Sequence, residues 1–360
     1  LKASDEIKTK PTQHSVKELR SIGIQPDIII CRSERPIPLE HRKKISLFCN
    51  VDIKNVIETV DVRTIYEAPM SFFREKLDVQ VLNYFKLKSK KSVNLKPWKK
   101  ITKIILQNRR QVNIAIIGKY VDLKDAYKSL DEALMHGSLS NNVELNTEWV
   151  DSTKINKNNV SKILKKYSAI LIPGGFGSRG TEGKIEAIAY ARKYKVPFFG
   201  ICFGMQMAII EFARNKLNIK KATSSEFETR GIPIVGLISE WNKNGRVFKG
   251  TNKNLGGTMR LGLYEAKLKE KSLIRKIYKS KLIQERHRHR YEVNISYKEK
   301  FEKNGLIFSG LSPDNKLPEI IELKNHPWFI AVQFHPEFKS RPLAPHPLFS
   351  SFIKAAKNHK

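Results

Sequence analysis

The chain has little cysteine, no long apolar run and few acidic residues. Its 360 residues include 3 cysteines, too few for a disulfide framework, so we expect a reducing environment. No apolar run approaches the roughly 18 residues that a membrane-spanning helix needs. The first residues, Leu-Lys-Ala-Ser-Asp-Glu, do not have the pattern of a signal peptide. We therefore expect a cytoplasmic protein that does not contact a membrane.

Acidic residues are outnumbered by basic ones, 35 against 67, which gives a formal net charge of +32. Clustered Lys and Arg would indicate nucleic-acid binding. Here the charge is spread along the whole chain, and lysine greatly outnumbers arginine, which is the better reader of bases and phosphates. No helix-turn-helix pattern or zinc-ligand spacing occurs. We interpret the excess as a solvated, lysine-rich surface that attracts nucleotide substrates, with nucleic-acid binding as a less favoured alternative.

Length and composition predict two domains. Residues 1–85 contain a buried-strand pattern within 22–33 and are predicted to be the last part of an α/β domain. Residues 86–111 are polar and basic, and we interpret them as a linker that ends in a short helix. Residues 112–360 are predicted to form a second domain. Because the chain begins with Leu1 rather than Met, we expect it to be a fragment or a processed product.

The second domain is predicted to be an α/β fold with a mostly parallel, doubly wound sheet. Its first strand, Val-Asn-Ile-Ala-Ile-Ile from residue 112, ends in a glycine turn. Further strand patterns alternate with helical ones, which is typical of such a sheet. The strand patterns lie near residues 147–150, 169–172, 197–201 and 329–334. Sites in open α/β sheets lie at the carboxyl ends of the strands, so we expect the active-site residues at these strand ends.

A thiol stands at one of these strand ends. Residues 200–206 are Gly-Ile-Cys-Phe-Gly-Met-Gln, which predicts a strand, a sharp turn with Cys202 at its apex, and a helix. This is the cysteine counterpart of a nucleophile elbow. Small flanking residues let the backbone bend, and a helix N-terminus favours the thiolate. A cysteine in an apolar segment is, however, more often an inert core residue.

Two further strand ends supply what a nucleophile needs. The segment Ile-Ala-Val-Gln-Phe-His-Pro-Glu places His335 at the end of an alternating strand, with Glu337 two residues on. A histidine can take the thiol proton and a carboxylate can orient it. The segment Pro-Gly-Gly-Phe-Gly at 173–177 follows a buried strand. Its backbone N–H groups are candidates for an oxyanion hole.

These three motifs together resemble the class I (triad) glutamine amidotransferase family. The resemblance implies that Cys202 attacks the side-chain amide of glutamine, that His335 is the acid/base and that Glu337 orients it. It also implies an oxyanion hole from Gly175 and Phe203. The residues implied to hold glutamine are Gly175, Phe203, Gly204, Met205, Gln206, Glu226 and Arg290. Glu226 would meet the ammonium group and Arg290 the carboxylate end of the substrate.

The run Arg-His-Arg-His-Arg at 286–290 admits two other interpretations, a solvated basic patch or a metal-like histidine pair. It lacks acidic or thiol co-ligands nearby, so we expect no metal site in this chain.

Segments outside the triad motifs resemble the CTP synthase family, over essentially all 360 residues. They include Lys-Thr-Lys-Pro-Thr-Gln from residue 8, Gly-Gly-Thr-Met-Arg-Leu-Gly from residue 256 and Glu-Arg-His-Arg-His-Arg-Tyr-Glu-Val-Asn from residue 285. The resemblance implies amination of UTP by ammonia from glutamine, with ATP as co-substrate. It assigns UTP, or CTP as feedback inhibitor, to Lys8, Thr9, Lys10, Pro11, Thr12, Gln13 and Lys44. It assigns ATP to Val60, Asp61 and Val62, and GTP activation to Arg179, Gly180 and Glu182.

The chain departs from this family pattern in one respect. No Gly-Lys-[Ser/Thr] motif of an ATP-gripping P-loop occurs, so we expect the N-terminal part of the synthetase domain, with its Mg²⁺ ligands, to be absent. We therefore expect this chain alone to carry out only glutamine hydrolysis. We also expect a homo-oligomer, a tetramer as in the intact family. Two alternatives remain, a stand-alone γ-glutamyl hydrolase or peptidase and a non-catalytic regulatory or scaffold remnant.

Overall fold

The computed structural model describes residues 7–89, 91–119, 127–227, 230–237 and 259–359, and the backbone alone of 240–243 and 246–249. The chain divides into two compact units, Leu1–Gln107 and Asn108–Lys360. The domain boundaries predicted at 85/86 and 111/112 stay predictions. Gly256 to Thr258, part of a motif quoted above, lie outside the described residues. No helix within the described ranges is long and apolar enough to cross a membrane.

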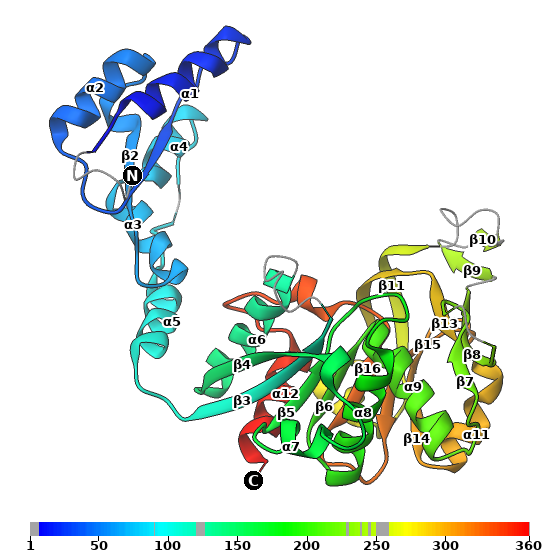
Figure 1. The fold of residues 1–360 in the computed structure, drawn as a ribbon. Coiled ribbons are helices and arrows are strands. Elements are labelled where there is room, and N and C mark those ends of the chain that lie inside the picture. The colour runs from blue at the N-terminus through cyan, green and yellow to red at the C-terminus, as the bar shows by residue number, and fades with distance from the viewer. Residues whose placement is uncertain are drawn as a thin grey trace. The chain divides into compact units, whose positions relative to one another are not determined.

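The N-terminal unit is a small α/β assembly (Figure 1). Two parallel strands, β1 and β2, pair from Ile29↔Val56 to Ser33↔Val60. Alternate residues of β1 enter a core with residues of α2, such as Ile45 and Cys49. The elements of this unit are α1 (Lys10–Ser21), β1 (Ile29–Ser33), α2 (Leu39–Cys49), β2 (Val56–Val60), α3 (Ala68–Arg74), α4 (Leu77–Tyr84) and α5 (Lys96–Leu106), with 3₁₀ turns η1 (Ile53–Asn55) and η2 (Ile65–Glu67).

The C-terminal unit is built on a nine-stranded sheet in the order β12-β11-β14-β15-β16-β6-β5-β3-β4 (Figure 1). The strands from β16 to β4 pair in parallel, and those from β16 to β12 pair antiparallel. Its strands are β3 (Gln111–Gly118), β4 (Glu144–Asp151), β5 (Ala169–Ile172), β6 (Phe198–Ile201), β11 (Arg260–Leu268), β12 (Leu282–His289), β14 (Leu306–Leu311), β15 (Pro318–Leu323) and β16 (Phe329–Val332). The expected α/β class is confirmed, and the sheet is mixed because an antiparallel half continues the parallel one.

Helices cover both faces of this sheet, because successive side chains of its strands point to opposite sides. In β3, Ala115 and Ile117 join one core with residues of α8 and α9, whereas Ile114 and Ile116 join the other with residues of α6 and α12. The helices are α6 (Lys128–Asn141), α7 (Val160–Leu164), α8 (Thr181–Tyr194), α9 (Phe203–Asn215), α10 (Leu273–Tyr278), α11 (Lys298–Lys303) and α12 (Pro347–Asn358). The 3₁₀ turns are η4 (Ser152–Lys154), η5 (Ile295–Tyr297) and η6 (Pro336–Lys339).

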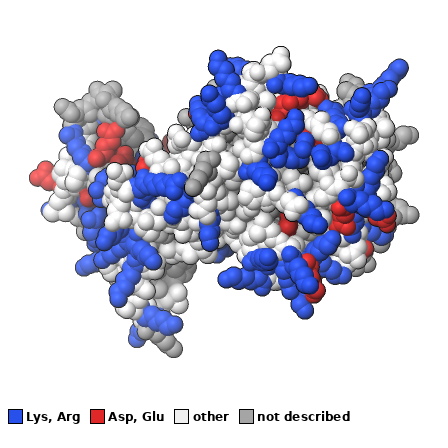
Figure 2. All heavy atoms as spheres, turned by 90° about the horizontal axis from the view of Figure 1, so that it is seen from below, with Lys and Arg blue, Asp and Glu red and all other residues white. Residues whose placement is uncertain are grey.

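The C-terminal unit also contains two smaller sheets. One has the order β13-β8-β7, with β7 (Ala222–Ser224), β8 (Ile232–Leu237) and β13 (Tyr291–Val293). The other is the hairpin of β9 (Glu240–Lys243) and β10 (Arg246–Lys249). Lys and Arg side chains are spread over the face seen in Figure 2, with few Asp and Glu between them.

Candidate active site

Cys202 lies at the sharp turn between β6 and α9. Its φ of 50° and ψ of −99° fall where L-residues rarely sit, and strained backbone of this kind concentrates at functional sites. The side chain is 5% exposed, and the backbone N–H donates to the Val332 carbonyl at 2.7 Å. Because α9 begins at the next residue, Cys202 lies at the positive end of that helix.

The turn is held by glycines that have no room for a side chain. A Cβ on Gly204 would lie 2.3 Å from the Ile172 carbonyl oxygen, and one on Gly200 would lie 2.8 Å from the Ala331 Cβ. The helix that starts at the thiol is therefore packed directly against β5, and the strand before it against β16. This close packing fixes the position of the backbone that carries the Cys202 side chain.

His335 follows β16, and its Nδ1 lies 2.7 Å from Oε1 of Glu337. A carboxylate only accepts, so Nδ1 carries a proton and Nε2 is left for exchange with the thiol. Burial lowers the pKa of His335, but the charge and hydrogen bonding of Cys202, and then of Glu337, outweigh burial and raise it to about 10. A Cβ on Gly174 would lie 2.7 Å from the ring, so the glycine turn packs directly against this imidazole.

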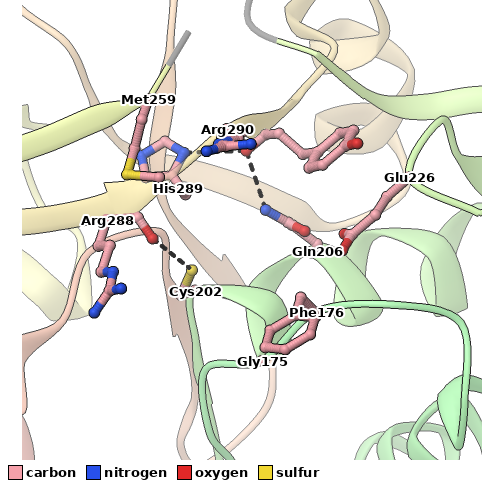
Figure 3. Close-up of a pocket in the computed structure, with 10 residues that line it drawn as sticks. Gly175, Phe176, Cys202, Gln206, Glu226, Met259, Arg288, His289 and Arg290 are labelled. Atoms are coloured by element: carbon pink, nitrogen blue, oxygen red, sulfur yellow. Dashed lines mark hydrogen bonds between the residues drawn. The ribbon is translucent and has the colours of Figure 1, made fainter. Parts of the chain in front are cut away.

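Strand β12 touches both the nucleophile and the base through its main chain. The Arg286 carbonyl accepts from the His335 N–H at 2.8 Å, and the Arg288 carbonyl lies 4.0 Å from the Cys202 sulfur (Figure 3). On another side Gln333 Nε2 donates to the same sulfur at 3.5 Å. The sulfur therefore contacts β12 on one side and the segment after β16 on the other.

A cavity of about 450 Å³ opens beside Cys202 (Figure 3). Glu226 lies on one side of it, where its Oε1 accepts the Gly177 N–H at 2.7 Å. Burial raises the pKa of Glu226, while that N–H and the charge of Lys119 act in the opposite direction. The lining residues are Gly175, Phe176, Cys202, Gln206, Glu226, Met259, Arg288, His289, Arg290 and Tyr291. A carboxylate and a guanidinium thus line one cavity with the thiol.

A second cavity, of about 490 Å³, shares Cys202 and Gly175 and also reaches His335 and Lys184. Lys184 is buried, and its Nζ lies 3.2 Å from Ser152 Oγ. Burial, followed by the charge of Lys119, lowers the pKa of Lys184 to about 8. Two cavities therefore border the thiol, one lined by Glu226 and the other by Lys119 and Lys184.

The structure brings most of the predicted glutaminase residues together. Gly175, Gln206, Glu226 and Arg290 line the first cavity and Phe203 the second, whereas Gly204 and Met205 are buried in α9 and line neither. The predicted oxyanion donors, the N–H groups of Gly175 and Phe203, lie on segments that border Cys202.

The residues predicted for GTP activation lie at the start of α8. Arg179 is exposed, Gly180 precedes the helix with a φ of 76°, and Glu182 pairs with Arg214 at 2.9 Å. They do not line either cavity.

The residues predicted for nucleotides lie in the N-terminal unit. Lys8 and Thr9 precede α1, and residues 10–13 form its first turn, where Gln13 Nε2 donates to Thr9 Oγ1 at 3.1 Å. Lys44 is exposed on α2. Val60 ends β2, and Asp61 after it pairs with Arg32 at 2.7 Å. The triad cavities contain none of these residues.

Comparison with known sequences settles the family. A family model described as "Glutamine amidotransferase class-I" matches residues 122–355. A second one, "CTP synthase N-terminus", matches residues 1–87. CTP synthase from Pelagibacter ubique is 80% identical over all of this chain and 67% of its own length. The chain belongs to the CTP synthase family. The relative from Rhodospirillum rubrum is 53% identical over 99% of this chain and 66% of its own length.

A solved relative supports the fold of the family's glutaminase part. It is the glutaminase domain of Trypanosoma brucei CTPS with bound acivicin, 36% identical, with a TM-score of 0.62 over 69% of this chain and 95% of that domain. The chain spans about two thirds of the length of the curated CTP synthases it matches.

One expectation is wrong. We expected the N-terminal part of the CTP synthase family to be absent, yet the family's N-terminal sequence model matches residues 1–87. The missing Gly-Lys-[Ser/Thr] motif misled us, because it concerns one loop and not the whole N-terminal part. The description of the chain as a fragment is likewise not supported.

Sequence reasoning gave no role to several residues that border Cys202 or His335, among them Arg288, Gln333, Gly174 and Lys184. The alternation of β12 and β16 is a signal that could have placed Arg288 and Gln333, since each stands an even number of residues from a residue already singled out. No local signal marks Lys184, which is buried by the packing of distant segments.

Proposed function

We propose that this chain hydrolyses glutamine with Cys202, His335 and Glu337, and that the ammonia released serves the conversion of UTP to CTP. One observation supports the proposal most. A thiol at a helix N-terminus lies beside a largely buried His–Glu pair, and the adjoining cavity carries both Glu226 and Arg290. Family membership gives this chemistry its substrate class.

The reaction begins with attack of the Cys202 thiolate on the side-chain amide carbon of glutamine. The N–H groups of Gly175 and Phe203 stabilise the oxyanion that forms. His335, whose pKa is raised to about 10, gives its proton to the leaving nitrogen, and ammonia departs from a glutamyl thioester. Water then attacks the thioester, His335 takes the proton of that water, and glutamate and the thiolate are released.

Selectivity for free glutamine follows from the charges at the first cavity. The Glu226 carboxylate binds the ammonium group, and the Arg290 guanidinium binds the carboxylate at the same end of the amino acid. A substrate lacking either group leaves one of these charges unpaired in a half-buried site, which is an effective way to reject it.

The N-terminal unit is proposed to serve the synthetase reaction. Lys8 to Gln13 and Lys44 would bind UTP, or CTP as inhibitor. Val60 to Val62 would contact ATP, whose phosphates require Mg²⁺. Arg179, Gly180 and Glu182 would respond to GTP as activator. The proposal includes a cytoplasmic homotetramer. A stand-alone γ-glutamyl hydrolase and a scaffold remnant are not favoured, because the relatives that match the whole chain are CTP synthases.

The decisive experiment measures glutamate released from glutamine by the full chain and by Cys202→Ala. We expect the variant to lose activity by about a thousandfold or more, as is typical of a removed nucleophile. The matched control is Cys31→Ala, which removes another buried thiol, in β1, and is expected to retain activity. Equal activity of Cys202→Ala and the unchanged chain would refute the triad. Turnover of γ-glutamyl peptides in preference to glutamine would favour the hydrolase instead.

A further inference from the structure

Five polar side chains are buried together beneath the active site, and we call them the β12 polar cluster. They come from strands β11, β12, β13 and β15, and none is more than 6% exposed. They are Arg260, His287, His289, Glu292 and Glu319. Such groups are costly to bury unless their hydrogen bonds and charges are matched, so their protonation states can be worked out from the partners each has.

The cluster lies on the inner side of the strand that carries the catalytic contacts. Along β12, His287 and His289 are buried while Arg286 and Arg288 are exposed. The main-chain carbonyls of those two arginines face the His335 N–H and the Cys202 sulfur. Whatever holds His287 and His289 therefore also holds the backbone that contacts the nucleophile and the base.

A chain of hydrogen bonds fixes the two imidazoles. His289 Nδ1 lies 3.0 Å from the Tyr291 carbonyl oxygen, which only accepts, so His289 Nδ1 carries the proton. Burial, with the charges of Arg260 and His335, holds the pKa of His289 well below its usual range, so His289 Nε2 is unprotonated. This atom accepts from His287 Nδ1 at 3.0 Å. The other nitrogen of His287, Nε2, is then also an acceptor, since burial keeps the pKa of His287 low too.

The second ring nitrogen of His287, Nε2, faces a carboxyl oxygen. His287 Nε2 lies 3.5 Å from Glu319 Oε2, and neither atom has a hydrogen-bond partner among the described residues. Two acceptors in contact require a proton between them. The other oxygen of Glu319, Oε1, accepts from Arg260 Nη2 at 2.8 Å.

The charges of the cluster balance when that proton lies on Glu319. Arg260 lies between Glu319 and Glu292, whose Oε2 is 3.5 Å from Arg260 Nη1. Burial raises the pKa of both carboxyls, and further for Glu292 than for Glu319; two close carboxyls beside one cation hold one proton between them. The neighbouring atoms decide which carboxyl holds it, because Glu292 Oε2 faces two donors, Arg260 Nη1 at 3.5 Å and His289 Nδ1 at 3.7 Å. A proton on Glu319 meets the acceptor His287 Nε2. Glu292 then carries the negative charge that matches Arg260.

We propose that Glu319 is a protonated positioning residue of the glutaminase site, donating to His287 and so holding β12 against Cys202 and His335. Through the relay from His287 to His289, it also holds the strand that leads to Arg290. Its effect on turnover rests on the proposed glutamine hydrolysis, while its protonation state does not.

The test compares Glu319→Gln with Glu319→Leu in the full chain. Glutamine presents a carbonyl to Arg260 and an N–H to His287, the same pattern as a protonated carboxyl, whereas leucine presents neither. We expect Glu319→Gln to keep kcat and the KM for glutamine within about threefold, and Glu319→Leu to lose about tenfold or more in kcat/KM, the magnitude of one or two buried hydrogen bonds. If Glu319→Gln falls as far as Glu319→Leu, the carboxyl is ionised and the proposal is overturned.

A matched control lies on the same strand. Glu322 of β15 accepts from two backbone N–H groups, of Leu273 and Ile274, at 2.9 and 2.8 Å. Both of its oxygens therefore act as acceptors, and Glu322→Gln exchanges one of them for an NH₂ that faces another donor. We expect this substitution to lower the melting temperature more than Glu319→Gln does, with an unchanged KM for glutamine.

A measurement without turnover keeps the proposal testable if the leucine variant fails to fold or if the chain does not hydrolyse glutamine. Infrared spectra of the ¹³C-glutamate-labelled chain at neutral pH are expected to show a protonated carboxyl band that disappears in Glu319→Gln. ¹⁵N spectra are expected to show His287 neutral, with its proton on Nδ1. A charged imidazolium at His287, or a carboxyl band that Glu319→Gln leaves unchanged, would overturn the assignment.

Discussion

Substitutions at Glu337 separate two contributions of this carboxylate to the proposed triad, its hydrogen bond and its charge. Oε1 accepts from His335 Nδ1 at 2.7 Å, and both side chains are largely buried. A glutamine at 337 can still place a carbonyl oxygen against Nδ1, so the tautomer of His335 is kept and the charge is lost. An alanine removes both.

The expected magnitudes follow from the strength of each contact. A hydrogen bond to a charged group contributes about 1.5–3 kcal/mol and a neutral one about 1 kcal/mol. Glu337→Ala is therefore expected to lower kcat by about 10- to 150-fold. Glu337→Gln loses only the difference between the two kinds of bond, about 0.5–2 kcal/mol, and is expected to lower kcat by about two- to thirtyfold. KM should change little, because Glu337 does not line the cavity that holds Glu226 and Arg290.

The assay is the steady-state release of glutamate from glutamine at saturating and limiting concentrations. The reasoning is refuted if Glu337→Ala keeps kcat within about twofold of the unchanged chain, or if Glu337→Gln is the more damaged of the two. A rise in KM with kcat unchanged would show instead that Glu337 acts in substrate binding.

Two further predictions concern stability. His335 has a folded pKa of about 10, raised from 6.5 chiefly by Cys202 against the effect of burial. Its stabilisation is thus complete below pH 6.5 and lost as pH rises toward 10. Urea unfolding from pH 6.5 to 10 should show a smaller loss of stability in Cys202→Ala, and an equal loss would contradict this origin of the shift. Gly204→Ala would place a Cβ 2.3 Å from the Ile172 carbonyl oxygen and should lower the free energy of unfolding by about 1–3 kcal/mol. Its control is Gly236→Ala, where the nearest atom is 3.8 Å away, and equal effects of the two changes would refute the packing argument.

The sequence predicted correctly those parts of the fold that depend on short local patterns of apolar and small residues. The elbow at Cys202 and the glycine turn at 173–177 follow from apolar runs that end in small residues, and the structure has a strand end at each. The antiparallel half of the sheet was not anticipated. Its strands β11 and β12 carry Arg260 and Glu285 on their buried sides, so their hydrophobic alternation is weak.

The Arg-His-Arg-His-Arg run shows why part of the site escaped prediction. Its composition is that of a solvated basic patch, yet its first four residues form the end of β12, with His287 and His289 buried. The alternation of Arg and His, which matches the two-residue period of a strand, was visible in the sequence. Glu319, which His287 faces, and Arg260, which pairs with Glu319, come from other strands, and only the folded chain shows that they meet.

The strained backbone conformation of Cys202 affects which residues are favoured at this position during evolution. With φ at 50° and ψ at −99°, the position imposes a conformational penalty on any L-residue, about 1–3 kcal/mol. Glycine would relieve it, but glycine has no thiol. The residue that performs the proposed chemistry thus opposes folding slightly at its own position. Selection for stability alone would favour glycine here, so a cysteine at this turn is itself a signature of use.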